Sequence, residues 1–207
     1  SLRRQRQMCI RDRRYTHWVF DMDGTLTIAV HDFAAIRVAL DIPPEDDILH
    51  HLAALPPEVS KAKHAWLLEH ERELAIASRP AAGAVALVRG LHARGLRLGI
   101  LTRNARELAL LTLQAIGVKD CFAADDILGR DEAPPKPDPG GLLHLADRWQ
   151  VATGDMVMVG DHRHDLACGR AAGTATVLVN LPNNPWPELS DHFVADCAAL
   201  QLSLIHI

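Results

Sequence analysis

Short apolar runs alternate with helical patterns from Trp18 almost to the end of the chain. Such an alternation is typical of a parallel β-sheet that is covered on both faces by helices. Each apolar run is short enough for a strand. The predicted strands are 16–20, 96–101, 122–124, 156–159, 176–179 and 193–194. The predicted fold class is therefore α/β, with three layers.

Helix signals fall between the predicted strands. Pro80, Asn104 and Asp138 each stand where a helix can begin, either as a first-turn proline or as an N-cap. Gly95 and Gly117 can end the first two of these helices, because glycine readily adopts the left-handed conformation found there. We expect these helices to cover the sheet.

The interval 28–79 interrupts this alternation. It lacks a convincing strand, and proline pairs at 43–44 and 56–57 separate its helical stretches. We predict a helical insertion after the first strand. Residues 14–27 and 80–201 would then form the core domain.

Both ends of the chain resemble translated adapter sequence. The start matches a translation of the transposon-end oligonucleotide used in library preparation, and the tail matches a translation of its reverse complement. We therefore predict that residues 1–13 and 202–207 are artefacts and that the arginine-rich start is neither a nucleic-acid arm nor a targeting peptide. Without residues 1–12 and 202–207, the formal charge of −4 becomes −7.

This acidic balance leaves no basic stripe for binding nucleic acid. No apolar run approaches the ~20 residues of a membrane span. We expect a soluble, cytoplasmic protein with neither a nucleic-acid partner nor a membrane partner. Cys121, Cys168 and Cys197 have no metal-ligand spacing, and we predict buried, reduced thiols.

The strongest chemical signal is the pair Asp21 and Asp23, which with Gly24 follows the first predicted strand. Alternate side chains of an extended segment point the same way, so both carboxylates can face one site. That site would lie at the carboxyl edge of the sheet, where ligands bind in such folds. An Asp-Gly pair after a strand can also be only a turn, so this motif alone leaves both interpretations open.

Three further motifs carry polar residues that can reach the same edge. Prolines on both sides of Lys136 restrict the backbone and can aim its ammonium group inward. A helix that begins near Asn104 would offer its positive end to an anion. Another predicted strand ends in two acids. The polar residues of these motifs are Thr102, Arg103, Asn104, Lys136, Asp161 and Asp165.

In this order, the motifs resemble the haloacid dehalogenase superfamily over about residues 15–200. The resemblance implies a Rossmann-like core, and the insertion would be the small helical cap of a subfamily I, phosphoglycolate-phosphatase-like member. Asp21 would be the nucleophile that forms an aspartyl phosphate, and Asp23 would be the general acid and base. Thr102 would bind a phosphoryl oxygen, and Lys136 would neutralise Asp21 and the phosphate.

The resemblance also implies a magnesium ion. Four carboxylates opposed by one lysine would repel a phosphate, and a divalent cation removes that conflict. Hard oxygen ligands fit magnesium better than zinc. The implied metal ligands are Asp21, Asp23, Asp161 and Asp165. The implied contacts of the phosphate ester are Gly24, Thr102, Arg103, Asn104 and Lys136.

His162 and His164 depart from the family pattern, in which a serine commonly follows the first acid of this motif. Two histidines beside acids can indicate a transition-metal site. Exposed loop histidines are the more ordinary interpretation, because the oxygen ligands already account for the acids.

The function that these motifs predict is a magnesium-dependent phosphomonoesterase that acts on a small metabolite, of the phosphoglycolate, sugar phosphate or nucleotide class. A phosphomutase needs the same residues and stays an alternative, as does a catalytically weak module that binds phosphate or metal. A phosphatase homologue that has lost its activity would normally lack some of the site residues, and this sequence retains all of them. A dehalogenase fits less well, because it needs neither magnesium nor a second acid at the position of Asp23.

Overall fold

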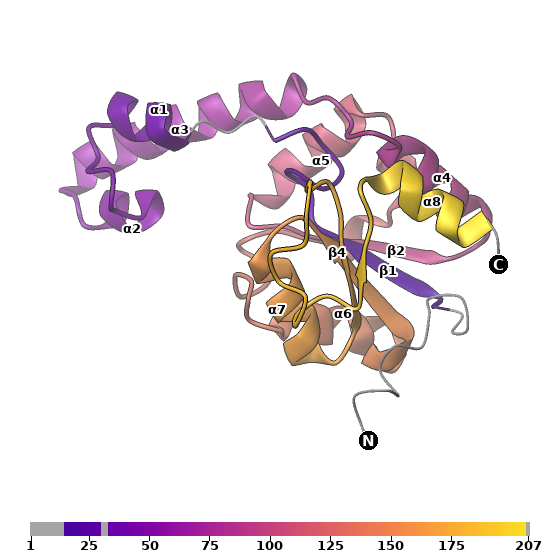
Figure 1. Cartoon of the computed structure of the whole chain (residues 1–207). Helices are drawn as coiled ribbons and strands as arrows, with labels where there is room; N and C mark the ends of the chain where they lie inside the picture. Colours follow the sequence, from indigo (N-terminus) through magenta and orange to yellow (C-terminus); the bar gives the residue numbers. More distant parts are fainter. Residues whose placement is uncertain (1–14, 30–32, 206–207) are drawn as a thin grey trace.

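The computed structural model describes residues 15–29 and 33–205 and contains a six-stranded sheet with eight α-helices (Figure 1). The sheet order is β3-β2-β1-β4-β5-β6, and all neighbouring strands are parallel. The strands are β1 (His17–Phe20), β2 (Arg97–Leu101), β3 (Ile127–Leu128), β4 (Met156–Gly160), β5 (Ala175–Leu178) and β6 (His192–Phe193). The helices are α1 (Phe33–Ala39), α2 (Ile48–Ala53), α3 (Pro57–Ile76), α4 (Ala84–Ala93), α5 (Arg106–Ala115), α6 (Gly140–Trp149), α7 (Arg163–Ala172) and α8 (Cys197–Ile205).

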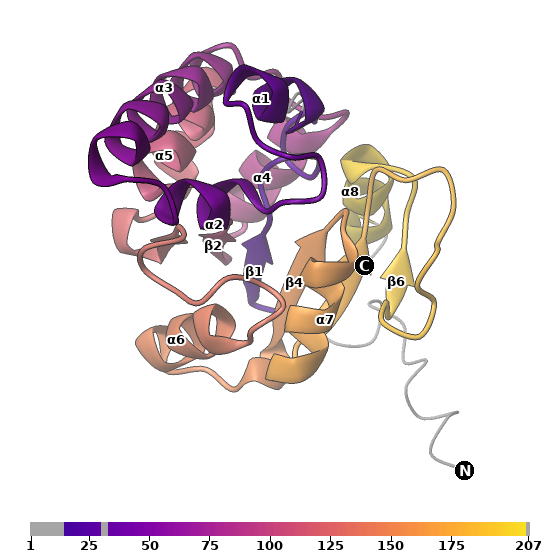
Figure 2. The ribbon, with the colours of Figure 1, turned by 90° about the vertical axis from the view of Figure 1, so that its left-hand side faces the viewer.

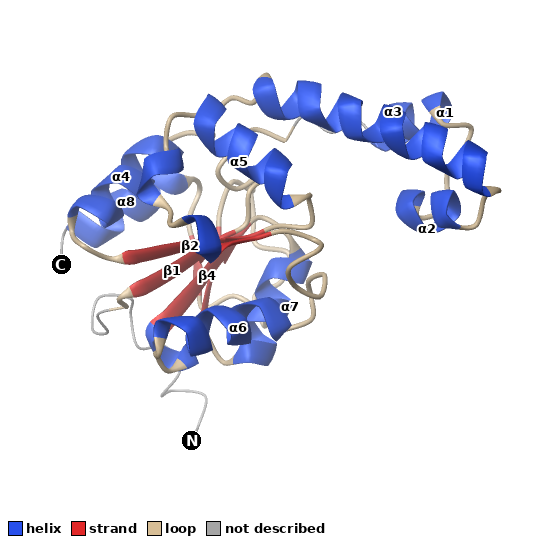
Figure 3. Ribbon diagram, turned by 180° about the vertical axis from the view of Figure 1, so that it is seen from behind, coloured by secondary structure: helices blue, strands red, loops and turns tan. Residues whose placement is uncertain are grey.

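Helices cover both faces of the sheet, as the three predicted layers require (Figure 3). Helices α4, α5 and α8 lie on one face, and α6 and α7 lie on the other. Successive residues of β1 point to opposite faces. Trp18 and Phe20 pack with the first set of helices, whereas Val19 packs with the second. The strand is therefore buried on both sides, which explains its continuous apolar run.

The inserted helices between β1 and β2 form a small cap, and α1 to α3 extend from the core on the side of α5 (Figure 2). The outer part has an apolar core of its own that includes Ile36, Leu52 and Leu67. The inner end of α3 packs against α5, where Ala75 meets Leu108. The predicted helical insertion is confirmed, while the boundaries 28–79 stay a prediction.

Five of the six predicted strands agree with the structure to within one residue, and one is wrong. Residues 122–124 do not pair with the sheet, because the chain there joins two 3₁₀ helices, Lys119–Cys121 and Ala124–Asp126. Phe122 packs into the main core, and this burial explains why the segment contains a large apolar residue although it is not a strand. The third strand is β3, which begins at Ile127.

All three predicted helix starts are shifted. Helix α4 begins at Ala84 with Gly83 as its N-cap, because Pro80 instead forms an isolated antiparallel bridge with Thr27.

The other two starts are shifted by one residue. Ala105 and not Asn104 is the N-cap of α5, because the side chain of Asn104 turns to the Asp23 carboxylate. Pro139 is the N-cap of α6, although Asp138 still accepts a hydrogen bond of 2.8 Å from the amide of Gly140. For α5 and α6 the local signal is therefore correct to within one position.

Cys121, Cys168 and Cys197 are buried free thiols, as predicted. Among the described residues, no helix is long and apolar enough to cross a membrane. Residues 202–205 continue α8, and Leu204 packs into the main core. Residues 1–13 and 206–207 lie outside the described residues, so the prediction for those segments is not tested.

Candidate active site

The candidate site begins where β1 and β4 end side by side. Phe20 pairs with Val159, and the amide of Asp21 donates to the carbonyl of Val159 over 2.9 Å. From β1 the chain crosses to β2 on one side and later reaches β4 on the other. The carboxyl ends of strands at such a switch point form the usual ligand crevice of this kind of sheet.

Gly24 allows the chain to turn directly after the two acids. Its φ is +85°, and a Cβ atom at this position would lie 2.3 Å from Oδ2 of Asp161. The amide of Gly24 donates to the carbonyl of Thr27 over 3.0 Å, which closes the turn. Only glycine fits here without moving the backbone or the Asp161 carboxylate.

Lys136 reaches the site from the proline-bounded loop that precedes α6. Its Nζ atom lies 2.5 Å from Oδ1 of Asp21 and 2.7 Å from Oδ1 of Asp165, and only 4% of the residue is exposed. Both carboxylates raise the pKa of Lys136 despite its burial. The ammonium group is therefore a fixed positive charge between two acids.

Carboxylate oxygens of Asp21, Asp161 and Asp165 lie within 4.8 Å of one another. Burial raises the pKa of Asp21 to about 8, although Lys136 opposes this shift and the other two acids add to it. Burial also raises the pKa of Asp161. Three acids facing one ammonium group thus hold more negative charge than the site neutralises. A group of hard oxygen donors with an excess of negative charge fits a divalent cation of the magnesium type.

Asp23 lies apart from this group of three. Its Oδ2 accepts a hydrogen bond from Nδ2 of Asn104, at 2.5 Å. The backbone amide of Asn104 donates to Oγ1 of the buried Thr102 over 3.2 Å. Arg103 is exposed. The motif that contains Asn104 therefore meets the first pair of acids at Asp23, whereas Lys136 and the pair Asp161 and Asp165 meet it at Asp21.

Asp165 has a second partner besides Lys136. Its Oδ2 accepts a hydrogen bond of 3.0 Å from the amide of His162, which is the N-cap residue of α7. The Asp165 carboxylate is thus held from both sides, and its position also secures the start of α7.

Two residues that support the site were not identified from the sequence. Thr25 donates from Oγ1 to Asp161 over 2.8 Å and lies 3.4 Å from Asp21. Asn180 donates from Nδ2 to the carbonyls of Gly24 and Thr25, over 2.7 and 2.8 Å. Asn180 directly follows the predicted strand 176–179 and lies two residues after the end of β5, so the rule that places polar residues at strand ends could have identified it.

Comparison with known proteins agrees with this geometry. Residues 15–173 match the sequence model of the haloacid dehalogenase-like hydrolase family. An uncharacterised hydrolase of Saccharomyces cerevisiae is 34% identical over 190 residues, which cover 90% of this chain and 87% of the yeast protein. A haloacid dehalogenase-like hydrolase domain-containing protein of Arabidopsis thaliana is 32% identical over 182 residues, covering 82% of this chain and 73% of the plant protein.

A solved structure shows the same fold. A predicted phosphoglycolate phosphatase from Haemophilus somnus superposes with a TM-score of 0.75 at 20% identity, covering 94% of this chain and 99% of that chain. At this identity the likeness supports the fold alone.

Proposed function

Since this chain belongs to the haloacid dehalogenase-like hydrolase family, we propose that it is a phosphatase that hydrolyses phosphoric monoesters of small metabolites. The observation that carries the proposal is Lys136, which holds Asp21 and Asp165 together at a buried strand edge where Asp161 also lies. An ammonium group in this position can neutralise both a carboxylate nucleophile and phosphoryl oxygens.

Asp21 is the proposed nucleophile. One of its carboxylate oxygens forms a bond to phosphorus while the bond between phosphorus and the ester oxygen breaks, leaving an aspartyl phosphate. Water then attacks this phosphate and releases the Asp21 carboxylate. Two such displacements replace one difficult direct attack by water.

Asp23 is the proposed general acid and base. It would give a proton to the departing alkoxide and take one from the attacking water. The hydrogen bond from Asn104 fixes the Asp23 carboxylate. The proposed general acid and base is thus a different group from the proposed nucleophile, Asp21. Gly24, Thr102 and Arg103 complete the proposed contacts of the phosphate ester.

We propose magnesium as the cofactor, because the donor set consists of hard oxygen atoms with excess negative charge. Asp21, Asp161 and Asp165 lie close enough together to share an ion, and Asp23 is the fourth proposed ligand. When bound, the ion would polarise the phosphoryl group and offset the charge of the acids.

Several relatives support a small phosphate ester as the substrate class. A phosphoglycolate phosphatase of Nitrosospira multiformis is 31% identical over 166 residues, covering 80% of this chain and 66% of that protein. An N-acetylmuramic acid 6-phosphate phosphatase of Pseudomonas aeruginosa is 28% identical over 184 residues, covering 78% of this chain and 80% of that protein. The relatives thus act on chemically different esters, and we propose only the class for this chain.

The test is phosphate release from a panel of phosphate esters, with magnesium and with a chelator. We expect Asp21→Asn to lower kcat by about a thousandfold or more, since it removes the attacking group. Asp120→Asn is the matched control, because Asp120 is exposed and its side chain makes only a surface ion pair with Arg89. If Asp21→Asn turned over esters at the wild-type rate, the nucleophile assignment would be wrong.

A further inference from the structure

Three aromatic side chains form a cluster beside the acidic site, and we call His162, His164 and Trp186 the aromatic rim. The ring centroids of His162 and His164 are 4.6 Å apart at an interplanar angle of 65°. Those of His162 and Trp186 are 5.8 Å apart at 60°. Edge-to-face contacts in this range are favourable. His162 is exposed and the other two are half-buried, so the rim is a formed surface that still has an open face.

Hydrogen bonds hold His162 in place. As the N-cap of α7, it accepts a hydrogen bond of 3.2 Å from the amide of His164 at its Nδ1 atom. Its own amide donates to Asp165, which is one of the three clustered acids. The imidazole ring is therefore fixed by the same residues that shape the candidate active site.

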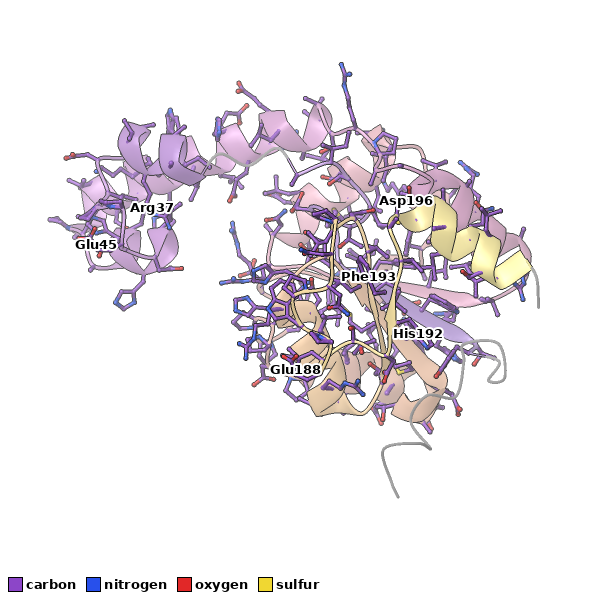
Figure 4. The ribbon with its side chains drawn as sticks, in the orientation of Figure 1. Arg37, Glu45, Glu188, His192, Phe193 and Asp196 are labelled. Carbon is purple, nitrogen blue, oxygen red and sulfur yellow. The ribbon has the colours of Figure 1, made fainter. Side chains whose placement is uncertain are left out.

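The loop that carries Trp186 is tied down as well. The amide of Trp186 donates to Oδ1 of Asn184 over 3.0 Å, and Nε of Arg170 donates to the carbonyl of Leu189 over 3.0 Å. Arg170 belongs to α7, so this hydrogen bond ties the loop to the helix. Glu188 marks this loop beside α7 in Figure 4.

The aromatic rim adjoins the candidate active site. His162 directly follows Asp161, whose carboxylate belongs to the acidic group. The amide of His162 donates to Asp165 over 3.0 Å, and Asp165 is ion-paired with the same Lys136 Nζ atom that contacts Asp21. The rim therefore begins directly beside the group of acids that contains Asp21.

We propose that the aromatic rim binds the leaving group of the phosphate ester and favours ring-shaped leaving groups, such as a sugar or a nucleoside, over short acyclic ones. The inference rests on the proposed phosphatase function and deepens it. A ring can lie against the imidazole and indole groups, and contacts with aromatic rings are favourable for flat or ring-shaped partners. A two-carbon acyclic leaving group has no ring to place against these groups.

Two variants remove parts of the aromatic rim without removing its support. His162→Ser deletes the imidazole but keeps a residue that caps helices well, so α7 keeps its start. Trp186→Leu keeps an apolar side chain in the loop and deletes the flat indole. Phe193→Leu is the matched control, because Phe193 is 39% exposed and lies on β6, on the far side of β5 from β4.

The measured quantity is the ratio of kcat/KM for ring-bearing esters to kcat/KM for acyclic esters. A hexose 6-phosphate and a nucleoside 5′-monophosphate represent the two ring types, and phosphoglycolate and glycerol 3-phosphate represent the acyclic type. We expect His162→Ser and Trp186→Leu each to lower this ratio about five- to tenfold, mainly through KM, as loss of one aromatic contact implies. Phe193→Leu should leave it unchanged. The ring type that loses more is the one that depends more on the aromatic rim.

Binding without turnover separates this inference from the proposed function. In the Asp21→Asn background, calorimetry with magnesium present measures the affinity for the same esters. The proposal is supported if ring-bearing esters bind more tightly than acyclic esters and if His162→Ser or Trp186→Leu abolishes this preference. That result would support the aromatic rim even if the wild-type protein releases no phosphate. Equal affinity for ring-bearing and acyclic esters, or a preference that both variants retain, overturns it, even if acyclic esters are hydrolysed.

Discussion

Replacement of Lys136 by methionine tests how the candidate active site balances its charge. In the structure one ammonium group faces two carboxylates, at 2.5 and 2.7 Å, and the residue is 4% exposed. Methionine keeps much of the length of the side chain and removes the charge. Removal of one partner from a buried ion pair typically costs about 3–5 kcal/mol.

Protonation of Asp21 should limit this cost. Burial already raises the pKa of Asp21 to about 8, and loss of Lys136 removes the group that opposes this shift. The variant can therefore bury a neutral acid instead of an unpaired anion. We expect a loss of unfolding free energy of about 2–4 kcal/mol at pH 8, below the full cost of an unpaired buried charge.

The direction of the pH dependence follows from the raised pKa. An acid whose pKa is higher in the folded state than in the unfolded state takes up a proton on folding, so its contribution to stability falls as pH rises between the two values. In the wild type this fall ends near pH 8, where Asp21 ionises. In Lys136→Met it continues to higher pH, at up to ~1.4 kcal/mol per pH unit. The difference in stability should therefore stay nearly constant from pH 6 to about pH 8 and widen from there to pH 9.

Urea unfolding in the presence of a chelator at pH 6, 7.5 and 9 measures this difference. Lys119→Met is the matched control, since Lys119 is exposed on the surface of the core. Addition of magnesium should restore more stability to Lys136→Met than to the wild type, because a bound cation offsets the same acids. Phosphate release should fall by about 10²–10³. Equal urea midpoints for Lys136→Met and the wild type at every pH would refute the assigned role of the ammonium group.

Three other substitutions test the supports of the site. Gly24→Ala should lower the free energy of unfolding by at least about 1–2 kcal/mol in urea unfolding, because the φ of +85° at this position disfavours a side chain. The same substitution should lower magnesium-dependent phosphate release, because the added Cβ atom would clash with Asp161. Asn180→Ala removes two hydrogen bonds to backbone carbonyls and should cost about 1–3 kcal/mol in urea unfolding; an unchanged midpoint would contradict this support. Glu71→Gln weakens the 3.6 Å ion pair with Arg130, which joins α3 to the loop after β3. A double-mutant cycle of the two residues should give a coupling free energy of about 0.5–1 kcal/mol, and a coupling of zero would contradict a role for this pair.

The prediction of the site from the sequence succeeded where each residue directly follows a strand. Asp21 and Asp161 follow apolar runs that become β1 and β4, and parallel strands bring their carboxyl ends to one edge. Their meeting therefore required no knowledge of side-chain packing. The proposed roles of these residues in catalysis and metal binding stay predictions that the variants above test.

The sequence was less informative where packing decides the structure. The segment around Phe122 has the apolar character of a strand. It lies instead in a bend between two 3₁₀ helices, from which Phe122 packs into the core. The helix signal at Asn104 was displaced by one residue, because its side chain gains a stronger partner in the Asp23 carboxylate. In each case a distant contact outweighed a local preference.

The sequence by itself determined five of the six strands, the helical nature of the inserted cap and the position of Asp21 and Asp161 at strand ends. These features depend on short-range periodicity and on the burial of apolar runs, which a linear sequence records. Only the tertiary structure decided that Lys136 lies between Asp21 and Asp165, that Asn180 supports the turn at Gly24 and that Trp186 meets His162. Such contacts join segments far apart in the chain, and their geometry depends on how whole elements pack.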